Sequence, residues 1–232
     1  MLNIARENNF SETAFTVKEG SLYRLRWFTP KAEVDLCGHA TLATAYVVLR
    51  FYEESDTVTF TTHSGELTVS KSGGLYSMDF PAYELEPVPV SEAMCEALGV
   101  VPECAYIGRG LLCVLSDERQ VRECVPDLGK VSELEGLLVH ITARGHGGVD
   151  CVSRSFGPKL GISEDPVCGS GHCHIVPYWC KVLGRENITA YQASERGGYL
   201  YCREKTGGIL LSGQAVLYSQ AEILKEDNNE SD

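Results

Sequence analysis

Short stretches of alternating apolar and polar residues run through the first third of the chain. They read TAFTV, YRLRWF, TVTFTT, GELTVSKS and LYSMDF, with turns rich in Gly, Ser and acidic residues between them. A period of two is typical of strands with one buried face, so these stretches predict antiparallel sheet. Between them, residues 38–52 (GHATLATAYVVLRFY) are apolar nearly all round. Such a helix is buried on every side, so we expect it to lie inside a curved sheet.

The same plan recurs in the rest of the chain. After Pro87, PVSEAMCEALGV predicts a surface helix with Ser91 as its N-cap, and strands follow in AYIGRGLLCVLS and GLLVHITARG. Residues 169–183 (GSGHCHIVPYWCKVL) again follow a Gly-rich turn and again form a largely apolar helix pattern. Two last strands, YLYCREKT and GILLSGQAVLYSQAEIL, meet at Gly207-Gly208, which is a hairpin signal.

These elements predict an α+β fold of two pseudo-repeated lobes. Each lobe is a curved, mostly antiparallel, barrel-like sheet wrapped around a central helix, with the active site between the lobes. We expect residues 1–87 in the first lobe and residues 88–225 in the second, whose last strands cross back to the first lobe. The polar residues 226–232 form a frayed tail.

Composition narrows the possible partners and the compartment. The formal net charge of −12, without a basic cluster, argues against binding to nucleic acid. No apolar run approaches the roughly 20 residues that span a bilayer, and the N-terminus lacks the apolar core of a signal peptide. We therefore expect a cytoplasmic protein without a membrane partner, and its ten cysteines to be reduced. Most of them lie singly in apolar patterns and are assigned to packing, including Cys95, Cys113, Cys124, Cys151 and Cys202.

Each predicted central helix begins with a turn that contains an acid, a cysteine and a glycine. The turns read Asp35-Leu36-Cys37-Gly38-His39 and Asp165-Pro166-Val167-Cys168-Gly169-Ser170. A helix N-terminus presents unpaired N–H groups and about half a positive charge, so two facing ends form a cleft for a carboxylate or an enolate. Either turn alone is also consistent with a capped helix and a buried thiol. As a pair, Cys37 and Cys168 could act as the two bases of an epimerase or racemase.

A metal site is a further interpretation, suggested by His172, Cys173 and His174. Neighbouring residues on a helix point about 100° apart, whereas zinc ligands are usually separated by two to four residues, so the spacing is poor. His63, His140 and His146 are assigned to packing or to the surface. We expect no metal site.

Long motifs make the sequence similar to the phenazine-biosynthesis isomerase family, within the broader diaminopimelate-epimerase-like fold. They are NNFSETAF (8–15), LRWFTPKAEVDLCGHATLATAYV (25–47), SRSFGPKLGISEDPVCGSGHC (153–173), PYW (177–179) and QASERGG (192–198), in family order across nearly the whole chain. The resemblance implies two lobes, a homodimer, a small carboxylate-bearing substrate and a proton transfer that needs neither metal nor organic cofactor.

The resemblance also assigns roles to residues. Glu12 of the SET motif transfers the proton, and His39 and Asp165 complete the catalytic set. The substrate-binding residues are Gly38, Gly169, Ser170 and Gly171. We expect burial to raise the pKa of Glu12 toward the working pH and His39 to stay neutral at its helix start. Asp165 would fix the tautomer of His39 or hold a substrate amine.

Two features depart from the family pattern. The chain begins at the family's first helix, and the segment of about 30 residues that precedes this helix in the family pattern is absent. We therefore expect the first lobe to lack a strand. Its central helix should then be partly uncovered or shielded by a dimer partner. Cys168 stands where many relatives have threonine, which completes the pair with Cys37. The substrate carboxylate could also meet an arginine near the motifs. The candidates are Arg24, Arg26, Arg154 and Arg196.

Overall fold

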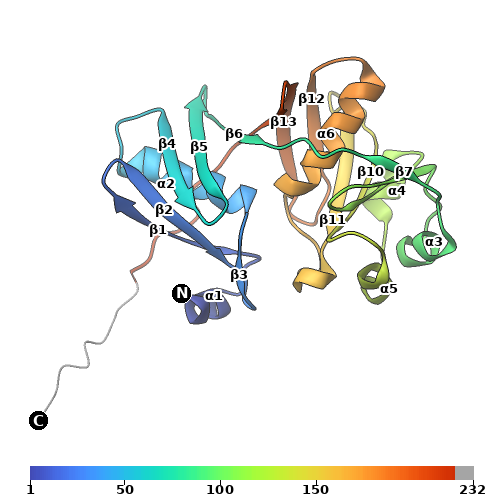
Figure 1. Ribbon diagram of the computed structural model, residues 1–232, viewed down its shortest axis with the longest axis horizontal. Helices are drawn as coiled ribbons and strands as arrows, with labels where there is room; N and C mark the ends of the chain where they lie inside the picture. Colours follow the sequence, from blue (N-terminus) through green and yellow to red (C-terminus); the bar gives the residue numbers. More distant parts are fainter. Residues whose placement is uncertain (223–232) are drawn as a thin grey trace, which may run out of the picture.

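The computed structural model describes residues 1–222 of the protein, so the predicted frayed tail at 226–232 lies outside the described residues. The protein has an α+β fold in which two lobes lie side by side, each with curved sheet around one long helix (Figure 1). These long helices are α2 (Gly38–Phe51) and α6 (Gly169–Leu183). Both predicted central helices are therefore confirmed, since their bounds agree with the sequence pattern to within one residue.

The other elements follow the predicted alternation of strands and turns. The chain begins with α1 (Leu2–Asn8), β1 (Thr13–Glu19), β2 (Leu22–Phe28), β3 (Glu33–Val34), β4 (Thr57–Thr62), β5 (Gly65–Ser72) and β6 (Leu75–Phe80). It continues with β7 (Glu86–Val88), α3 (Glu92–Leu98), β8 (Cys104–Ile107), β9 (Leu111–Val114), α4 (Glu118–Glu123), α5 (Leu128–Glu133), β10 (Val139–Arg144), β11 (Cys151–Phe156), a 3-10 turn (Pro158–Leu160), β12 (Asn187–Gln192), β13 (Gly198–Lys205) and β14 (Gly208–Gly213). The predicted cap of α3 is present, because the Ser91 hydroxyl accepts a hydrogen bond from the Met94 N–H at 3.2 Å.

The last predicted strand is shorter than its apolar pattern indicated. It ends at Gly213, where its pairing with β6 ends, and residues 214–222 form no strand. The chain then turns to the first lobe, where the Leu217 N–H donates to the Tyr46 hydroxyl at 3.2 Å. Val216 and Tyr218 are almost fully exposed, so the apolar pattern there reflects no buried face.

One sheet runs through both lobes. Its strand order is β1-β2-β4-β5-β6-β14-β13-β12-β11-β10-β9-β8-β7, with β3 paired to β2, and most neighbours are antiparallel. The strand β14 pairs with β13 on one side and with β6 on the other, so the ladder crosses from one lobe to the other without a break. The hydroxyls of Ser77 and Ser212 lie 2.7 Å apart across this junction. A domain boundary near residue 88 stays a prediction.

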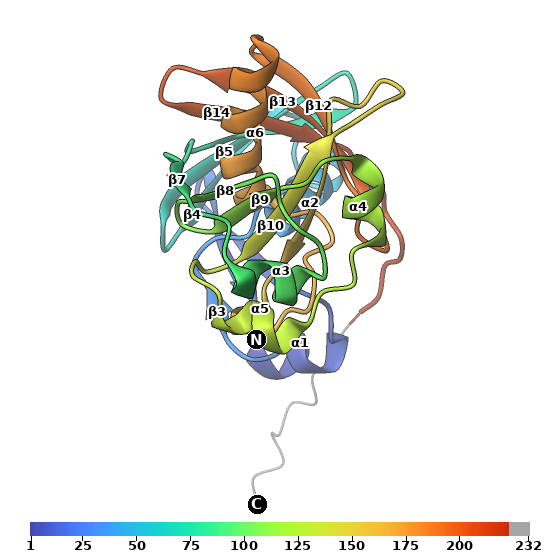
Figure 2. The same cartoon turned by 90° about the vertical axis from the view of Figure 1, so that its right-hand side faces the viewer.

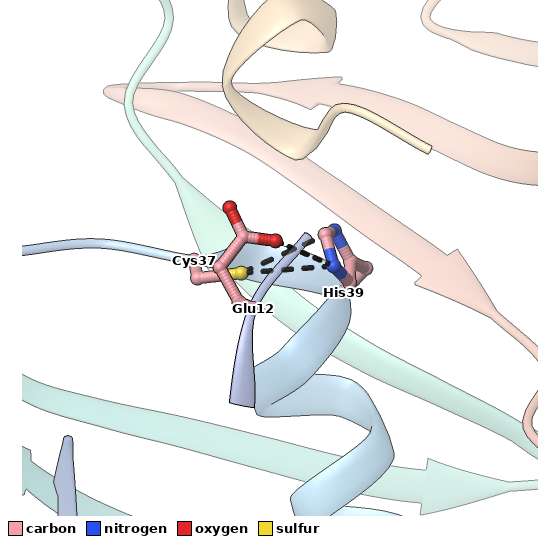
Figure 3. Close-up of side chains that lie close together, drawn as sticks. All are labelled: Glu12, Cys37 and His39. Carbon is pink, nitrogen blue, oxygen red and sulfur yellow. Dashed lines mark hydrogen bonds and ion pairs between the residues drawn. The ribbon is translucent and has the colours of Figure 1, made fainter. Parts of the chain in front are cut away.

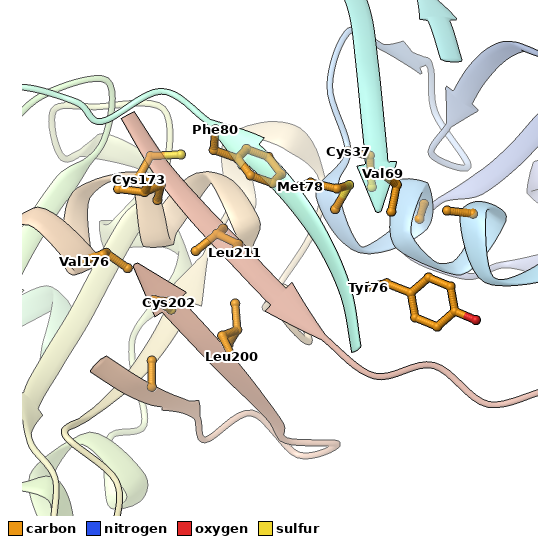
Figure 4. Close-up of a cluster of buried hydrophobic side chains, with 14 of the residues drawn as sticks. Cys37, Val69, Tyr76, Met78, Phe80, Cys173, Val176, Leu200, Cys202 and Leu211 are labelled. Carbon is orange, nitrogen blue, oxygen red and sulfur yellow. The ribbon is translucent and has the colours of Figure 1, made fainter. Parts of the chain in front are cut away.

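The hydrophobic core follows the sheet across the junction. One buried cluster joins side chains of both lobes, including Met78 and Phe80 of β6, Leu211 of β14 and Val176 of α6 (Figure 4). A second cluster lies under β8–β11 in the second lobe, where α3 and α5 pack against each other (Figure 2). Four of the five cysteines assigned to packing are buried, and Cys95 is partly exposed.

Helix α2 is not buried on every side, contrary to its sequence pattern. Tyr46 and Leu49 are buried, but Val47 and Phe51 are 36% and 50% exposed on the opposite face. The sheet of the first lobe ends at β1, and among residues 1–222 no strand covers this face of α2. Among residues 1–222, no helix has the length and apolar character needed to cross a bilayer.

Candidate active site

Glu12 and His39 face each other at the start of α2. Helix α1 ends at Asn9, which has a left-handed backbone (φ 50°), a conformation that Asn tolerates better than most residues. This turn brings Glu12 back onto α2, where its Oε2 lies 3.0 Å from Nε2 of His39. The Cys37 sulfur lies 3.9 Å from the same nitrogen, so the three side chains form one cluster (Figure 3).

Asp165 approaches the opposite nitrogen of His39. Its Oδ1 lies 3.8 Å from Nδ1 of the imidazole and accepts a hydrogen bond from the Val167 N–H at 3.0 Å. The side chains of Glu12, His39 and Asp165 are 7%, 20% and 14% exposed. The structure therefore brings together the three residues assigned as catalytic, with the imidazole between two carboxyl groups.

The pKa directions in this cluster are the reverse of the expected ones. Burial acts to raise the pKa of Glu12, but the hydrogen bond and charge of His39 outweigh it and lower that pKa. Burial acts to lower the pKa of His39, but its contacts with Cys37 and Glu12 and the charge of Asp165 raise that pKa well above its ordinary value. Our expectation of a raised pKa for Glu12 and of a neutral His39 was wrong, because it ignored their direct pairing. Burial raises the pKa of Asp165, and His39 lowers it only in part.

The first residues of α2 and α6 meet at two glycines. A methyl group added at Gly38 would lie 3.5 Å from the Cα of Gly169 and 3.0 Å from the ring of Phe80. Any larger residue at Gly38 would therefore push the two helix ends and the Phe80 ring apart. Both positively polarised N-termini thus point to the same place, as the repeated turns predicted.

The two cysteines at the helix entrances are buried thiols. Cys168 caps α6, because its sulfur accepts a hydrogen bond from the Gly171 N–H at 3.3 Å. Burial raises the pKa of Cys168 well above its ordinary value, and burial also raises the pKa of Cys37. At neutral pH both are therefore thiols, whereas a base must be available in its deprotonated form.

A cavity of about 340 Å³ opens onto this cluster. Gly38, Gly169 and Ser170 line it together with the three catalytic candidates, and Leu137, Leu138, Leu160 and Ile162 form an apolar wall. Gly171, which we predicted to bind substrate, does not line it. A side chain at Gly171 would instead meet His140 and Ser155, so its absence allows α6 to pack closely on β10 and β11. A second cavity of about 680 Å³ shares Gly38, His39, Phe80 and Gly169 with the first.

Within residues 1–222, the donor atoms close enough to share a metal ion belong to Glu12, Cys37 and His39. The residues that suggested a metal site in the sequence do not form such a group. His172 Nδ1 contacts the Cys168 carbonyl at 2.7 Å, and burial lowers its pKa to about 4. His174 Nε2 accepts a hydrogen bond from the Gly110 N–H at 3.0 Å.

Most of the arginines that we considered for the substrate carboxylate are already paired. Arg26 makes two contacts of 2.7 Å with Glu33, Arg154 binds Glu164 in the same way, and Arg24 pairs with Glu19. Arg196 lines only the second cavity. The arginine in the first cavity is Arg109, which the sequence analysis missed. Its signal was the sequence Gly-Arg-Gly between two predicted strands.

Comparison with known proteins assigns nearly all of the chain to one family. Residues 1–221 match the family model described as PhzC-PhzF, phenazine biosynthesis-like protein. An uncharacterized isomerase of Pseudomonas aeruginosa is 44% identical over 216 residues, which are 93% of this chain and 83% of that protein. A crystal structure from Enterococcus faecalis, described as a phenazine biosynthesis protein of the PhzF family, is 49% identical with a TM-score of 0.91, covering 94% of this chain and 84% of that one. A predicted epimerase of Pseudomonas aeruginosa shares the fold at 19% identity, with a TM-score of 0.74, covering 97% of this chain and 88% of that one.

Proposed function

Because the chain belongs to the phenazine biosynthesis-like (PhzC-PhzF) family of isomerases, we propose that it moves a proton between two positions of a small carboxylate-bearing molecule without a cofactor. The substrate is a dihydroaromatic or amino-acid-like acid. The observation that carries this proposal is the contact of 3.0 Å between Glu12 and His39 at the wall of a cavity that also holds two helix N-termini.

In this proposal Glu12 is the general base and then the general acid. Its lowered pKa keeps the carboxylate ionised at neutral pH, so it can accept a proton from an acidic C–H and return it at another carbon. The substrate displaces part of the contact with His39, which restores basicity to Glu12 at the moment of transfer.

His39 stabilises the negative charge that develops on the substrate. Its raised pKa keeps it protonated, so it offers an N–H with a full positive charge to an oxygen or to the delocalised carbanion. Asp165 holds the imidazole from the other side and helps to keep it charged. The N–H groups at Gly38, Gly169 and Ser170 bind the substrate carboxylate.

We assign no proton transfer to the alternative pair of Cys37 and Cys168. Their raised pKa values leave few thiolates at neutral pH, and the Cys168 sulfur is occupied as the cap of α6. A two-thiol epimerase would need both sulfurs ionised in turn and both open to the substrate.

Hydrogen exchange tests the proposal. The protein is incubated in D₂O with a panel of cyclic dihydro acids and amino acids, and loss of the C–H signal is followed by NMR. Glu12→Gln should slow exchange by about 10²–10⁴-fold, because an amide cannot accept the proton. Glu66→Gln, at an exposed position of β5, is the matched control and should exchange at the wild-type rate. Near-normal exchange in Glu12→Gln with loss in Cys168→Ser would reassign the chemistry to the thiols.

A further inference from the structure

The turn between β8 and β9 carries one arginine between two glycines, Gly108-Arg109-Gly110. The strands pair as far as Ile107 and Leu111, so these three residues form the whole hairpin loop. The Gly108 N–H donates to the Gly110 carbonyl at 3.0 Å, and the Arg109 carbonyl accepts from the Leu137 N–H at 3.0 Å. The backbone of Arg109 is therefore fixed at the cavity wall.

Both glycines are required by close packing. A Cβ at Gly108 would lie 2.9 Å from the Glu84 carbonyl oxygen, and a Cβ at Gly110 would lie 2.8 Å from Nε2 of His140. Distances under about 3 Å are sterically forbidden for carbon, so no other residue fits without a shift of the turn. The loop therefore presents one side chain, that of Arg109, from a backbone that cannot easily move.

A buried imidazole connects this turn to the first turn of α6. His174 is 1% exposed, and its Nε2 accepts the Gly110 N–H at 3.0 Å while its Nδ1 contacts the Ser170 carbonyl at 3.2 Å. Burial lowers the pKa of His174, which leaves Nε2 free of a proton and able to accept. The Gly110 backbone, next to Arg109, is thus held one imidazole ring away from the Ser170 carbonyl in the first turn of α6.

The Arg109 guanidinium has no carboxylate partner among the residues that the structure describes. Its contact is with the Tyr83 hydroxyl, at 3.4 Å from Nη1. The Tyr83 ring packs on the His174 ring, with centroids 4.8 Å apart, so this hydroxyl is also fixed. Arg109 lines the cavity as an exposed residue, so its guanidinium is open to an anion that enters and could bind a carboxylate through two N–H groups.

Carboxyl groups outnumber the cationic groups in this cavity. Glu12, Glu33, Asp35 and Asp165 line it, and Arg109 is its only arginine or lysine in the described part of the chain. His39 is paired with Glu12 and Arg26 with Glu33, so Asp35 and Asp165 leave the cavity acidic, and the partial charge of a helix N-terminus is too small to offset them. An anionic substrate needs a full positive charge at the place where it enters the first turn of α6.

We propose that Arg109 binds the substrate carboxylate together with the N-terminus of α6. The Gly108-Arg109-Gly110 turn thereby selects substrates that carry a carboxylate at this end of the cavity. The proposal rests on the proposed function for the identity of the reaction, but it concerns binding alone. Arg109 is a substrate-binding residue and takes no part in moving the proton. The turn and His174 keep its guanidinium at the place where the carboxylate binds.

Binding of 2-aminobenzoate and of its neutral counterpart 2-aminobenzamide tests this assignment, because the two probes differ only in the charged group. Their dissociation constants are measured by titration calorimetry for the wild type, Arg109→Ala, Arg109→Gln and Arg109→Lys. Removal of a hydrogen bond to a charged group should weaken binding of 2-aminobenzoate about tenfold or more in the Ala and Gln variants. The amide should bind all four proteins equally, and Arg109→Lys should show an intermediate loss for the acid, since lysine keeps the charge but not the planar fork.

Two further variants separate this proposal from the proposed function. Glu12→Gln should still prefer the acid to the amide even when exchange is lost. Arg119→Ala, which removes an exposed arginine of α4, is the matched control and should bind both probes as the wild type does. Wild-type affinity for 2-aminobenzoate in folded Arg109→Gln would overturn the assignment, and so would a wild-type protein that binds the acid no better than the amide.

Discussion

Replacement of Phe80 by alanine should destabilise the protein at the junction of the two lobes. The Phe80 ring is 7% exposed and sits against the first residues of both α2 and α6, where methyl groups at Gly38 and Gly169 would lie 3.0 and 3.4 Å from its Cζ atom. The ring also lines both the cavity of about 340 Å³ and the cavity of about 680 Å³. Phe80→Ala removes this shared wall and the aromatic ring that packs on both helix ends.

The size of the effect follows from the surroundings of the ring. A buried Phe→Ala change costs about 3–5 kcal/mol, and Phe80 should fall near the low end, about 3 kcal/mol, because part of its ring already faces empty space. For a chain of this length, such a loss lowers the melting temperature by about 6–12 °C. Urea unfolding followed by circular dichroism measures the free energy of unfolding directly.

A matched variant makes this test specific. Phe10→Ala removes the same side chain at a position that is 67% exposed, so it should change the free energy of unfolding by less than about 0.5 kcal/mol. Equal losses in the two variants, or a loss below about 1 kcal/mol in Phe80→Ala, would refute the reasoning that the ring joins the lobes.

Three further predictions concern the site and a helix end. The exchange rate should be flat around neutral pH. It should fall on the acid side only below the ordinary pKa of a glutamate, as Glu12 gains a proton, and on the alkaline side only above the ordinary pKa of a histidine, as His39 loses one. A pH profile of kcat/KM with an alkaline limb below pH 6.5 would contradict this. Cys168→Ser should keep at least half of the wild-type exchange rate, since serine also caps a helix. In the folded wild-type protein, Cys37 and Cys168 should react slowly with a thiol reagent at neutral pH, and fast labelling would show that the thiols are ionised. Ser91→Ala should lower the free energy of unfolding by about 1 kcal/mol through loss of the α3 cap, and no measurable change in urea unfolding would show that the cap contributes nothing.

The sequence predicts the frame of this protein because the signals for its elements are local. Residues 169–183 carry a glycine turn at one end and a continuous apolar pattern, and α6 has these bounds. The burial of α2 was overestimated for the opposite reason. Its pattern is apolar all round, but whether each face is covered depends on which strands lie next to it, and within the described part of the chain no strand covers Val47 and Phe51.

The proximity of Glu12, His39 and Asp165 could be predicted from the sequence, but their electrostatics could not. Glu12 is an ordinary loop glutamate by composition, and only its SET motif pointed to a role. The reversed pKa directions of Glu12 and His39 depend on a tertiary contact of 3.0 Å that no local pattern reveals. Arg109 was missed because its importance comes from a cavity whose walls are far apart in the sequence, from Glu12 to His174.

The position of β14 has a consequence for the order in which the chain folds during synthesis. Its contact with β6 joins Ser77 and Ser212, which are 135 positions apart. A ribosome therefore releases the first lobe with one edge of β6 unpaired, and this edge stays open until almost all of the described chain has emerged. Pairing at such separation is slow, so the newly made first lobe is the stage most exposed to aggregation and to capture by chaperones. The cavity at Glu12 and His39 takes its walls from residues as far along the chain as His174, so it cannot be complete until α6 has also been made.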